Sequence, residues 1–175
     1  ALEKKLANIR KNAPDRPVAM AVEEAETIED CRICIRGSVQ HRGEAVPRGV
    51  LQVATIGDPP QMPKDASGRR QLAEWIIGPR NPLTSRVYVN RVWYYLFGAG
   101  LVRTLDNFGT TGELPSHPEL LDHLAARFME DGWSAKRLVR ELVLSHAYRM
   151  STAGNAQSSA VDPENRLLWR MNLKR

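Results

Sequence analysis

The fold of this chain is decided by residues 81–98, which read NPLTSRVYVNRVWYYLFG. Asn81 followed by Pro82 is typical of a helix start, because the amide oxygen can accept from first-turn N–H groups and proline lacks one of the N–H groups that would be orphaned there. Gly98 is typical of a helix end, since glycine readily adopts the left-handed conformation that terminates helices. The stretch therefore predicts a helix over residues 82–97.

This helix is apolar on nearly every side, which is typical of a central buried helix. Its apolar residues are Val87, Val89, Val92, Trp93, Tyr94, Tyr95, Leu96 and Phe97. We expect the other helices of the chain to pack around it.

Three polar residues, Arg86, Asn90 and Arg91, interrupt that apolar surface. The spacing of Arg86, Asn90, Trp93 and Phe97 places these four side chains on one helix face. A buried guanidinium is costly unless it is paired, so a carboxylate should approach Arg86. The carboxylates nearest in sequence are Asp106, Glu113, Glu119 and Asp122.

Two interpretations of these polar residues stay open. The first is an ion-pair and amide network that pins two helices to the loop over residues 97–109. The second is a binding cleft for an anion or a carboxylate, in which His117 would lie at a helix N-terminus that favours anions. The candidate cleft residues are Arg86, Asn90, Arg91, Asp106, His117 and Glu119. Burial of Arg86 and Asn90 would distinguish the two interpretations.

Three more helices are predicted around residues 82–97, each from a capping serine followed by apolar residues at helical spacing. The serines are Ser67, Ser116 and Ser134, and Ser116 has capping-box spacing to Glu119. Residues 151–165 are predicted to be a polar loop, and residues 166–171 to begin a further helix. Because that helix is cut off within two turns, we expect a fragment of a longer protein, truncated at its C-terminal end.

Residues 1–66 differ from residues 67–175 in the secondary structure that their sequence pattern predicts. Leu2, Leu6 and Ile9 predict a short amphipathic helix ended by Pro14 and Pro17. Short β-like runs over residues 18–22, 31–36 and 49–54 predict a small hairpin or meander, and the proline-rich residues 57–63 a stiff connector. The predicted fold class is mainly α (α+β): a bundle of four to five helices over residues 67–175 with a small N-terminal β-hairpin arm within residues 1–66.

Charge is unevenly distributed along the 175 residues, whose net charge is +5. Residues 1–66 hold ten basic and ten acidic residues, whereas residues 67–175 hold fifteen and ten, and thirteen of those fifteen are arginine. Arginine is favoured for fixed bidentate pairing, so its excess indicates internal ion pairs. Nucleic-acid binding is not favoured, since no basic stripe with interleaved aromatic residues occurs. No apolar run is long enough for a transmembrane segment.

The two cysteines form a single C-x-x-C, Cys31 to Cys34. No histidine follows Cys34, so the pattern is not a c-type haem motif, and no second pair completes a zinc site. We expect the two thiols to pack within a strand, with a redox disulfide or a metal site borrowing His41 as alternatives. We also expect His146 to lie in the core, and we find no recognised catalytic, nucleotide-binding or metal-ligand motif.

Ordered motifs across most of the chain resemble the planctomycete-specific domain family catalogued as domain of unknown function 1553. The stretch over residues 81–93 carries the resemblance first, and the last matching motif is Asp162-Pro163-Glu164-Asn165-Arg166-Leu167-Leu168. Between them lie the matching segments over residues 97–102, 107–109, 115–122, 132–134 and 148–149. Two features depart from the family pattern: His123 stands where tryptophan is common, and Cys31 with Cys34 is no family signature.

The resemblance implies context rather than chemistry. Such domains form the C-terminal part of large, often exported bacterial proteins, next to another domain of unknown function and frequently a cytochrome c domain. The family's helical motif normally continues beyond the point where this chain ends. We therefore expect export to the periplasm or cell surface, sister domains of the same polypeptide as partners, no cofactor in this fragment, and haem as a candidate elsewhere in the parent protein. No catalytic residues carry over from the family.

The sequence therefore predicts a non-catalytic structural or interaction module of a larger extracytoplasmic protein, with an anionic or carbohydrate ligand as a candidate. The alternative is an enzyme domain that acts on a carbohydrate-like substrate through the six cleft residues named above.

Overall fold

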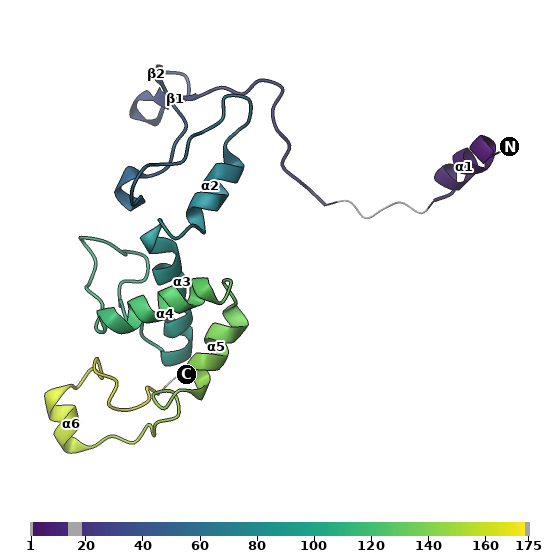
Figure 1. Ribbon diagram of the computed structural model, residues 1–175. Coiled ribbons are helices and arrows are strands. Elements are labelled where there is room, and N and C mark those ends of the chain that lie inside the picture. The colour runs from purple at the N-terminus through teal and green to yellow at the C-terminus, as the bar shows by residue number, and fades with distance from the viewer. Residues whose placement is uncertain (1, 14–18, 174–175) are drawn as a thin grey trace.

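The computed structural model describes residues 2–13 and 19–173. Within these residues the chain is mainly helical and carries one small antiparallel hairpin, so the predicted fold class is confirmed (Figure 1). The elements are α1 (Leu2–Lys11), β1 (Cys31–Cys34), β2 (Arg42–Val46), α2 (Arg69–Ile76), α3 (Pro82–Phe97), α4 (Pro118–Glu130), α5 (Ala135–Leu144) and α6 (Ala156–Val161), with 3₁₀ turns at Ile35–Gly37 and Gln52–Ala54.

Helix α3 begins and ends where local chemistry predicts. The side chain of Asn81 accepts from the backbone N–H of Leu83 at 3.1 Å and of Thr84 at 3.4 Å, and Pro82 occupies the first turn. Gly98 adopts a φ of 85° and donates its N–H to the carbonyl of Tyr94, which closes the helix. Both boundaries are confirmed.

Helices α3, α4 and α5 pack against one another and form the core of the molecule (Figure 1). Trp93 and Phe97 of α3 stack at 3.9 Å between ring centroids, and Tyr88 stacks on Phe128 of α4 at 4.9 Å. The buried apolar cluster is Val89, Trp93, Phe97, Leu101, Val102, Leu121, Leu124, Phe128, Leu138 and Leu142. Apolar burial in this cluster is the main force that holds the three helices together.

The expectation that α3 is buried on nearly every side is wrong. Tyr94 is 38% exposed and Tyr95 is 74% exposed. Because α4 and α5 cover the face that carries Val89, Trp93 and Phe97, the opposite face of α3 reaches the surface. Tyrosine tolerates that position because its ring is apolar and its hydroxyl can contact water.

The hairpin forms, but its second strand is not the predicted one. β1 pairs with β2 in the register Cys31↔Val46, Arg32↔Ala45 and Cys34↔Arg42, with an irregularity before Cys34. Residues 19–22 and 49–51 have no regular structure, so the β-like runs predicted there are wrong; Val18, Pro14 and Pro17 lie outside the described residues. Met20 and Val53 are almost fully exposed, so neither side chain packs against a partner strand.

Arg48 holds the segment before α2 together, and Trp75 joins that segment to α2. Arg48 donates to Asp30 at 2.9 Å and to the carbonyls of Ala66 and Pro63. Trp75 of α2 donates its indole N–H to the hydroxyl of Thr55 at 3.1 Å. The backbone before α2 therefore folds back along that helix.

The C-terminal segment differs from its prediction. A six-residue helix, α6, lies inside the predicted polar loop, and residues 166–171 form turns instead of a helix. The carboxylate of Asp162 accepts from the backbone N–H of Arg166 at 2.9 Å and of Leu167 at 2.7 Å, while Asn165 adopts a φ of 54°. Because these side chains satisfy backbone donors locally, they favour turns over a helix.

Among the described residues, no helix has the length and the apolar character needed to cross a membrane.

Candidate functional site

Arg86 pairs with a carboxylate of the next helix, as its position predicts. Its Nε donates to Asp122 Oδ1 at 2.7 Å, and its Nη1 donates to the carbonyl of Pro82 at 2.6 Å. The side chain of Arg86 is 32% exposed and that of Asp122 is 57% exposed. The predicted buried guanidinium is therefore corrected to a half-buried one that joins α3 to α4 at the surface.

Asn90 is sealed inside the molecule, with 1% of its surface exposed. Its amide nitrogen donates to the carbonyl of Val102 at 2.9 Å, and its amide oxygen accepts from the N–H of Val102 at the same distance. One side chain thus satisfies both backbone groups of a residue in the loop that follows α3. This pair matches the first interpretation, in which polar residues of α3 pin the loop over residues 97–109.

Gly100 makes that pair possible by its lack of a side chain. A Cβ at this position would lie 2.3 Å from the carbonyl oxygen of Val102 and 3.0 Å from both amide atoms of Asn90. Carbon atoms do not approach backbone oxygen this closely, so the loop requires glycine here.

Arg91 and Asp106 form a separate, solvent-exposed pair. Arg91 Nη2 lies 3.3 Å from Asp106 Oδ1, and the two side chains are 55% and 96% exposed. An ion pair this exposed is screened by water and contributes little to stability.

The predicted capping box at the start of α4 is wrong. Ser116 lies outside the cap position and binds the loop after α3, donating its backbone N–H to the carbonyl of Leu101 at 2.8 Å and its hydroxyl to the same oxygen at 3.3 Å. His117 holds the cap position without a side-chain cap, and its Nδ1 lies 3.0 Å from the Ser116 hydroxyl. Glu119 is exposed and has no polar partner in the described part of the chain.

Most of the six predicted cleft residues thus serve contacts within the fold. Asn90 binds Val102, and Ser116, next to His117, binds the adjacent Leu101, so both hold one loop between α3 and α4. Arg91 and Asp106 pair with each other at the surface. A binding role for these residues stays a prediction.

The cysteines of β1 do not pack inside the hairpin. Cys31 and Cys34 are both exposed and free, so the expected packing role is wrong. His41 binds the Ser38 hydroxyl at 3.0 Å, and no group of three or more metal-ligating side chains occurs among residues 2–13 and 19–173.

An apolar groove lies where the segment before α2 meets α2 and α3, and we call it the junction groove. It encloses about 440 Å³. Its lining residues are Leu51, Ala54, Trp75, Ile76, Asn81, Leu83, Thr84, Val87, Tyr88 and Arg91. Leu51 is 67% exposed, and Ile76 and Leu83 are each a little under 40% exposed. No sequence pattern indicates this groove, because Leu51 and Ala54 meet the residues of α2 and α3 only in the folded chain.

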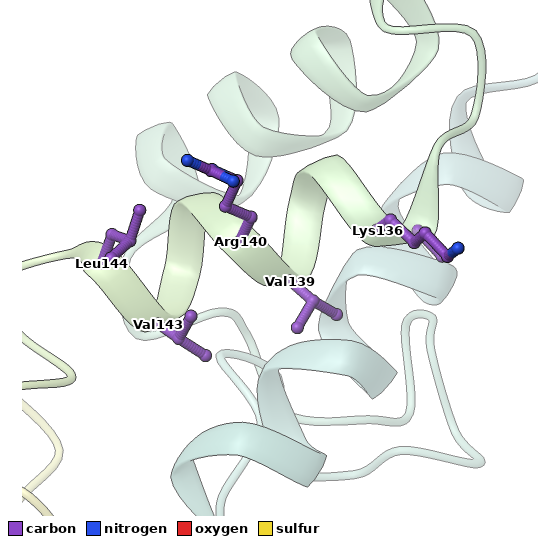
Figure 2. A pocket seen from close by; sticks show the side chains of 6 residues that line it. Lys136, Val139, Arg140, Val143 and Leu144 are labelled. Carbon is purple, nitrogen blue, oxygen red and sulfur yellow. The ribbon is translucent and has the colours of Figure 1, made fainter.

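A second apolar surface covers the outward side of α5, shown in Figure 2 and here called the α5 face. It spans about 580 Å³ and is lined by Ala135, Lys136, Val139, Arg140, Val143 and Leu144. Leu138 and Leu142 are buried, whereas Val139 is 36% and Leu144 is 57% exposed. His146 is also exposed, so its predicted place in the core is wrong.

The fold and these surfaces define a small, mainly helical domain whose inward polar side chains hold its loops and whose outward side carries apolar surfaces. Residues 68–175 match the family described as "Protein of unknown function (DUF1553)", named PSD1. This match covers more than half of the chain, and the chain therefore belongs to that family. No curated protein and no solved structure matches the chain.

Proposed function

We propose that this chain is a non-catalytic interaction module of a larger, exported bacterial protein, and that it docks against other domains of the same polypeptide. The junction groove is the observation that carries the proposal. Leu51, Ile76 and Leu83 come from three segments, yet they line one groove and all remain exposed. Apolar side chains gathered at one place on a surface are typical of an interaction site.

The contacts of Arg86 and Asn90 favour a role in holding the fold together over a role in catalysis. The enzyme alternative needs Arg86 and Asn90 to line an open cleft. Asn90 is sealed, with its amide engaged on both sides by Val102, and Arg86 is engaged by Asp122 and Pro82. These bonds hold α3, α4 and their connecting loop together, as expected if the two residues stabilise the fold of an interaction module.

A macromolecular partner fits the junction groove better than an anionic or carbohydrate ligand. An anion would be met there by Arg91, the cation among the lining residues, and this guanidinium is already paired with Asp106. Ligand sites for sugars and anions need several convergent polar groups. The walls of this groove are mainly aliphatic and aromatic, which suits an apolar surface of another domain.

Site-specific photo-crosslinking in the natural full-length polypeptide tests the proposal. A photoreactive phenylalanine analogue at Leu83, 39% exposed in the groove, should form crosslinks to residues of another domain. The same analogue at Leu114, 85% exposed and outside the groove, is the matched control and should not. Crosslinks of equal yield from both positions, or none from Leu83, would contradict docking at the groove.

The export component of the proposal rests on the family resemblance and has its own test. Fractionation of the source cells, followed by detection of the native polypeptide, should find it outside the cytoplasm. Recovery in the cytoplasmic fraction would remove export from the proposal and leave docking untouched.

A further inference from the structure

The α5 face is a continuous strip on the side of α5 that points away from the core. At about 100° per residue, Val139, Val143, Lys136, Arg140 and Leu144 fall within an arc of about 140°. This arc lies opposite the buried Leu138 and Leu142. In Figure 2, Val139 and Val143 point to one side of the helix and Arg140 with Leu144 to the other. Two cations therefore lie within a strip of aliphatic side chains.

The cations Lys136 and Arg140 of α5 differ from the other cations of α2–α5, all of which are arginines. Every other arginine on α2–α5 has a carboxylate within ion-pair distance. The pairs are Arg69–Glu24, Arg70–Glu74, Arg86–Asp122, Arg91–Asp106, Arg127–Glu141 and Arg137–Asp131. The side chains of Lys136 and Arg140 have neither an ion pair nor a hydrogen bond to any residue in the described ranges. Glu141 and Asp131, the acidic residues nearest in sequence, are already paired elsewhere.

This combination specifies the chemistry of a partner. Two like charges four residues apart on a helix repel each other, and a carboxylate placed between them relieves that repulsion. Val139, Val143 and Leu144 beside them lose contact with water when a partner covers them, which favours association. A partner that fits must bring acidic and aliphatic side chains at matching helical spacing.

We infer that the α5 face docks an acidic amphipathic helix. Its aliphatic side chains cover Val139, Val143 and Leu144, and its carboxylates pair with Lys136 and Arg140. This inference rests on the proposed function, since it names one docking surface of the interaction module and the chemistry of what it binds. Laying the apolar stripe of a helix on an apolar surface is a common mode of peptide recognition.

Two other occupants from this chain fit the charge less well. A second copy that packs α5 against α5 about a two-fold axis near Arg140 brings the two Arg140 guanidinium groups together. Helix α1 exposes Leu2, Leu6 and Ile9, but its sequence LEKKLANIRK carries four basic residues and one acidic residue. Both would add positive charge to a surface that already has it in excess.

Binding of synthetic peptides to the full chain tests the inference. The probe is a fluorescein-labelled helical peptide of about 18 residues, about five turns, with leucine at helical spacing and glutamate elsewhere. The matched peptide carries lysine in place of every glutamate. Fluorescence anisotropy should show binding of the glutamate peptide, binding at least about tenfold weaker for the lysine peptide, and loss of affinity as salt screens the charges. Equal affinity for both peptides would overturn the inference.

Charge reversal on α5 locates the binding surface. The double variant Lys136→Glu with Arg140→Glu should weaken binding of the glutamate peptide by about tenfold or more, because two attractions become two repulsions. The control, Lys5→Glu with Lys64→Glu, changes net charge equally at exposed positions off α5 and should bind like the unaltered chain. Circular dichroism should show both variants folded. Equal weakening in both variants would show a general charge effect and overturn the assignment to α5.

Two further measurements decide against the other occupants. The chain should not co-sediment with vesicles of phosphatidylcholine and phosphatidylglycerol. If it does, and if the double variant Lys136→Glu with Arg140→Glu does not, the α5 face binds membranes instead. In ultracentrifugation the chain should not self-associate through the α5 face. Self-association that is lost in Val139→Ser would assign the α5 face to a second copy of the chain.

The outcomes separate this inference from the proposed function. If the glutamate peptide fails to bind while crosslinks from Leu83 persist in the natural polypeptide, the α5 assignment alone is wrong. If those crosslinks are absent, docking at the junction groove is wrong, whatever the peptide does.

Discussion

The segment over residues 19–66 and the helices that follow are held by different forces. Residues 19–66 contain a single buried apolar residue, Ala54, within the described part of the chain. Their contacts are ionic and polar: Arg48 with Asp30, and Glu24 with Ser67 and Arg69. Helices α3, α4 and α5, with the loop after α3, share a cluster of ten buried apolar residues. Apolar side chains carry no charge to be screened or titrated, whereas exposed ion pairs are screened by salt and are lost when their carboxylates are protonated. The two regions should therefore respond to different perturbations.

The largest expected effect is on the apolar cluster. Phe97→Ala removes a ring that is 2% exposed and that contacts Trp93 and Tyr148. We expect a loss of about 3–5 kcal/mol in the free energy of unfolding, from lost burial and the cavity left behind. Chemical denaturation measures it. Val53→Ala, at a position 95% exposed, is the matched change before α2 and should have almost no effect. Equal losses would erase the distinction between the regions.

The next effect concerns the polar contact inside the helical region. Asn90→Leu keeps the approximate size of the side chain but leaves the N–H and carbonyl of Val102 buried without partners. Each buried unsatisfied backbone group costs about 1–3 kcal/mol, and burial of the apolar leucine side chain offsets part of the cost of the two. We expect a net loss of about 1–3 kcal/mol by denaturation, and faster hydrogen exchange at Val102. Unchanged exchange there would show that the loop is held by other contacts.

Acidification should act on residues 19–66 before it acts on the apolar cluster. The hydrogen bond from Ser67 lowers the pKa of Glu24 below its ordinary value of 4.5, and the hydrogen bond from Arg48 lowers the pKa of Asp30 below 3.8. Because both pKa values are depressed in the folded chain, these carboxylates stabilise it above their ordinary values. That stabilisation is lost as pH falls through the depressed ones.

Proteolysis and hydrogen exchange at pH 6 and pH 3, on either side of those ordinary values, check this expectation. Residues 19–66 should become accessible at the lower pH while Val89 and Leu124 of the cluster stay protected. Asp162 is a useful contrast, since hydrogen bonds from the N–H groups of Leu167 and Arg166 lower its pKa too. The turn after α6 should therefore loosen over a similar range. Simultaneous opening of the whole chain would mean that the regions unfold as one unit.

The smallest effect belongs to the surface pair between α3 and α4. Arg86→Ala removes the contact with Asp122, which is 57% exposed. Exposed pairs contribute about 0–1 kcal/mol, and screening by salt reduces this further. We expect a loss below about 1 kcal/mol that disappears in high salt, measured by denaturation at two salt concentrations. A larger, salt-independent loss would mean that Arg86 belongs to the buried contacts.

Local signals account for what the sequence predicts well. The boundaries of α3 follow from Asn81, Pro82 and Gly98, whose effects act within one helical turn. The cap at Ser134 follows in the same way, since its side chain accepts from Arg137. Ser116 carries the same type of signal and fails, because its hydroxyl binds Leu101 in a loop fifteen residues earlier. Tertiary contacts of that kind compete with caps and leave no local trace.

The site residues show the same difference between local signals and tertiary contacts. Sequence distance narrows the partner of Arg86 to four carboxylates, one of which is Asp122, and leaves two interpretations for Asn90. The junction groove could not be predicted, because Leu51, Ile76 and Leu83 meet only once the chain before α2 has folded back. The strand Arg42–Val46 was missed because Gly43 within it and Pro47 after it are typical of turns.

The contact between Asn90 and Val102 has a consequence for evolution. Position 90 must supply a donor and an acceptor in one short side chain, and position 100 must leave that side chain room. A mutation at either position alone is therefore deleterious. No single substitution at position 90 or position 100 is a neutral first step toward a different loop. We expect descendants of this sequence to keep asparagine and glycine together at these two positions, or to lose both along with the loop between them.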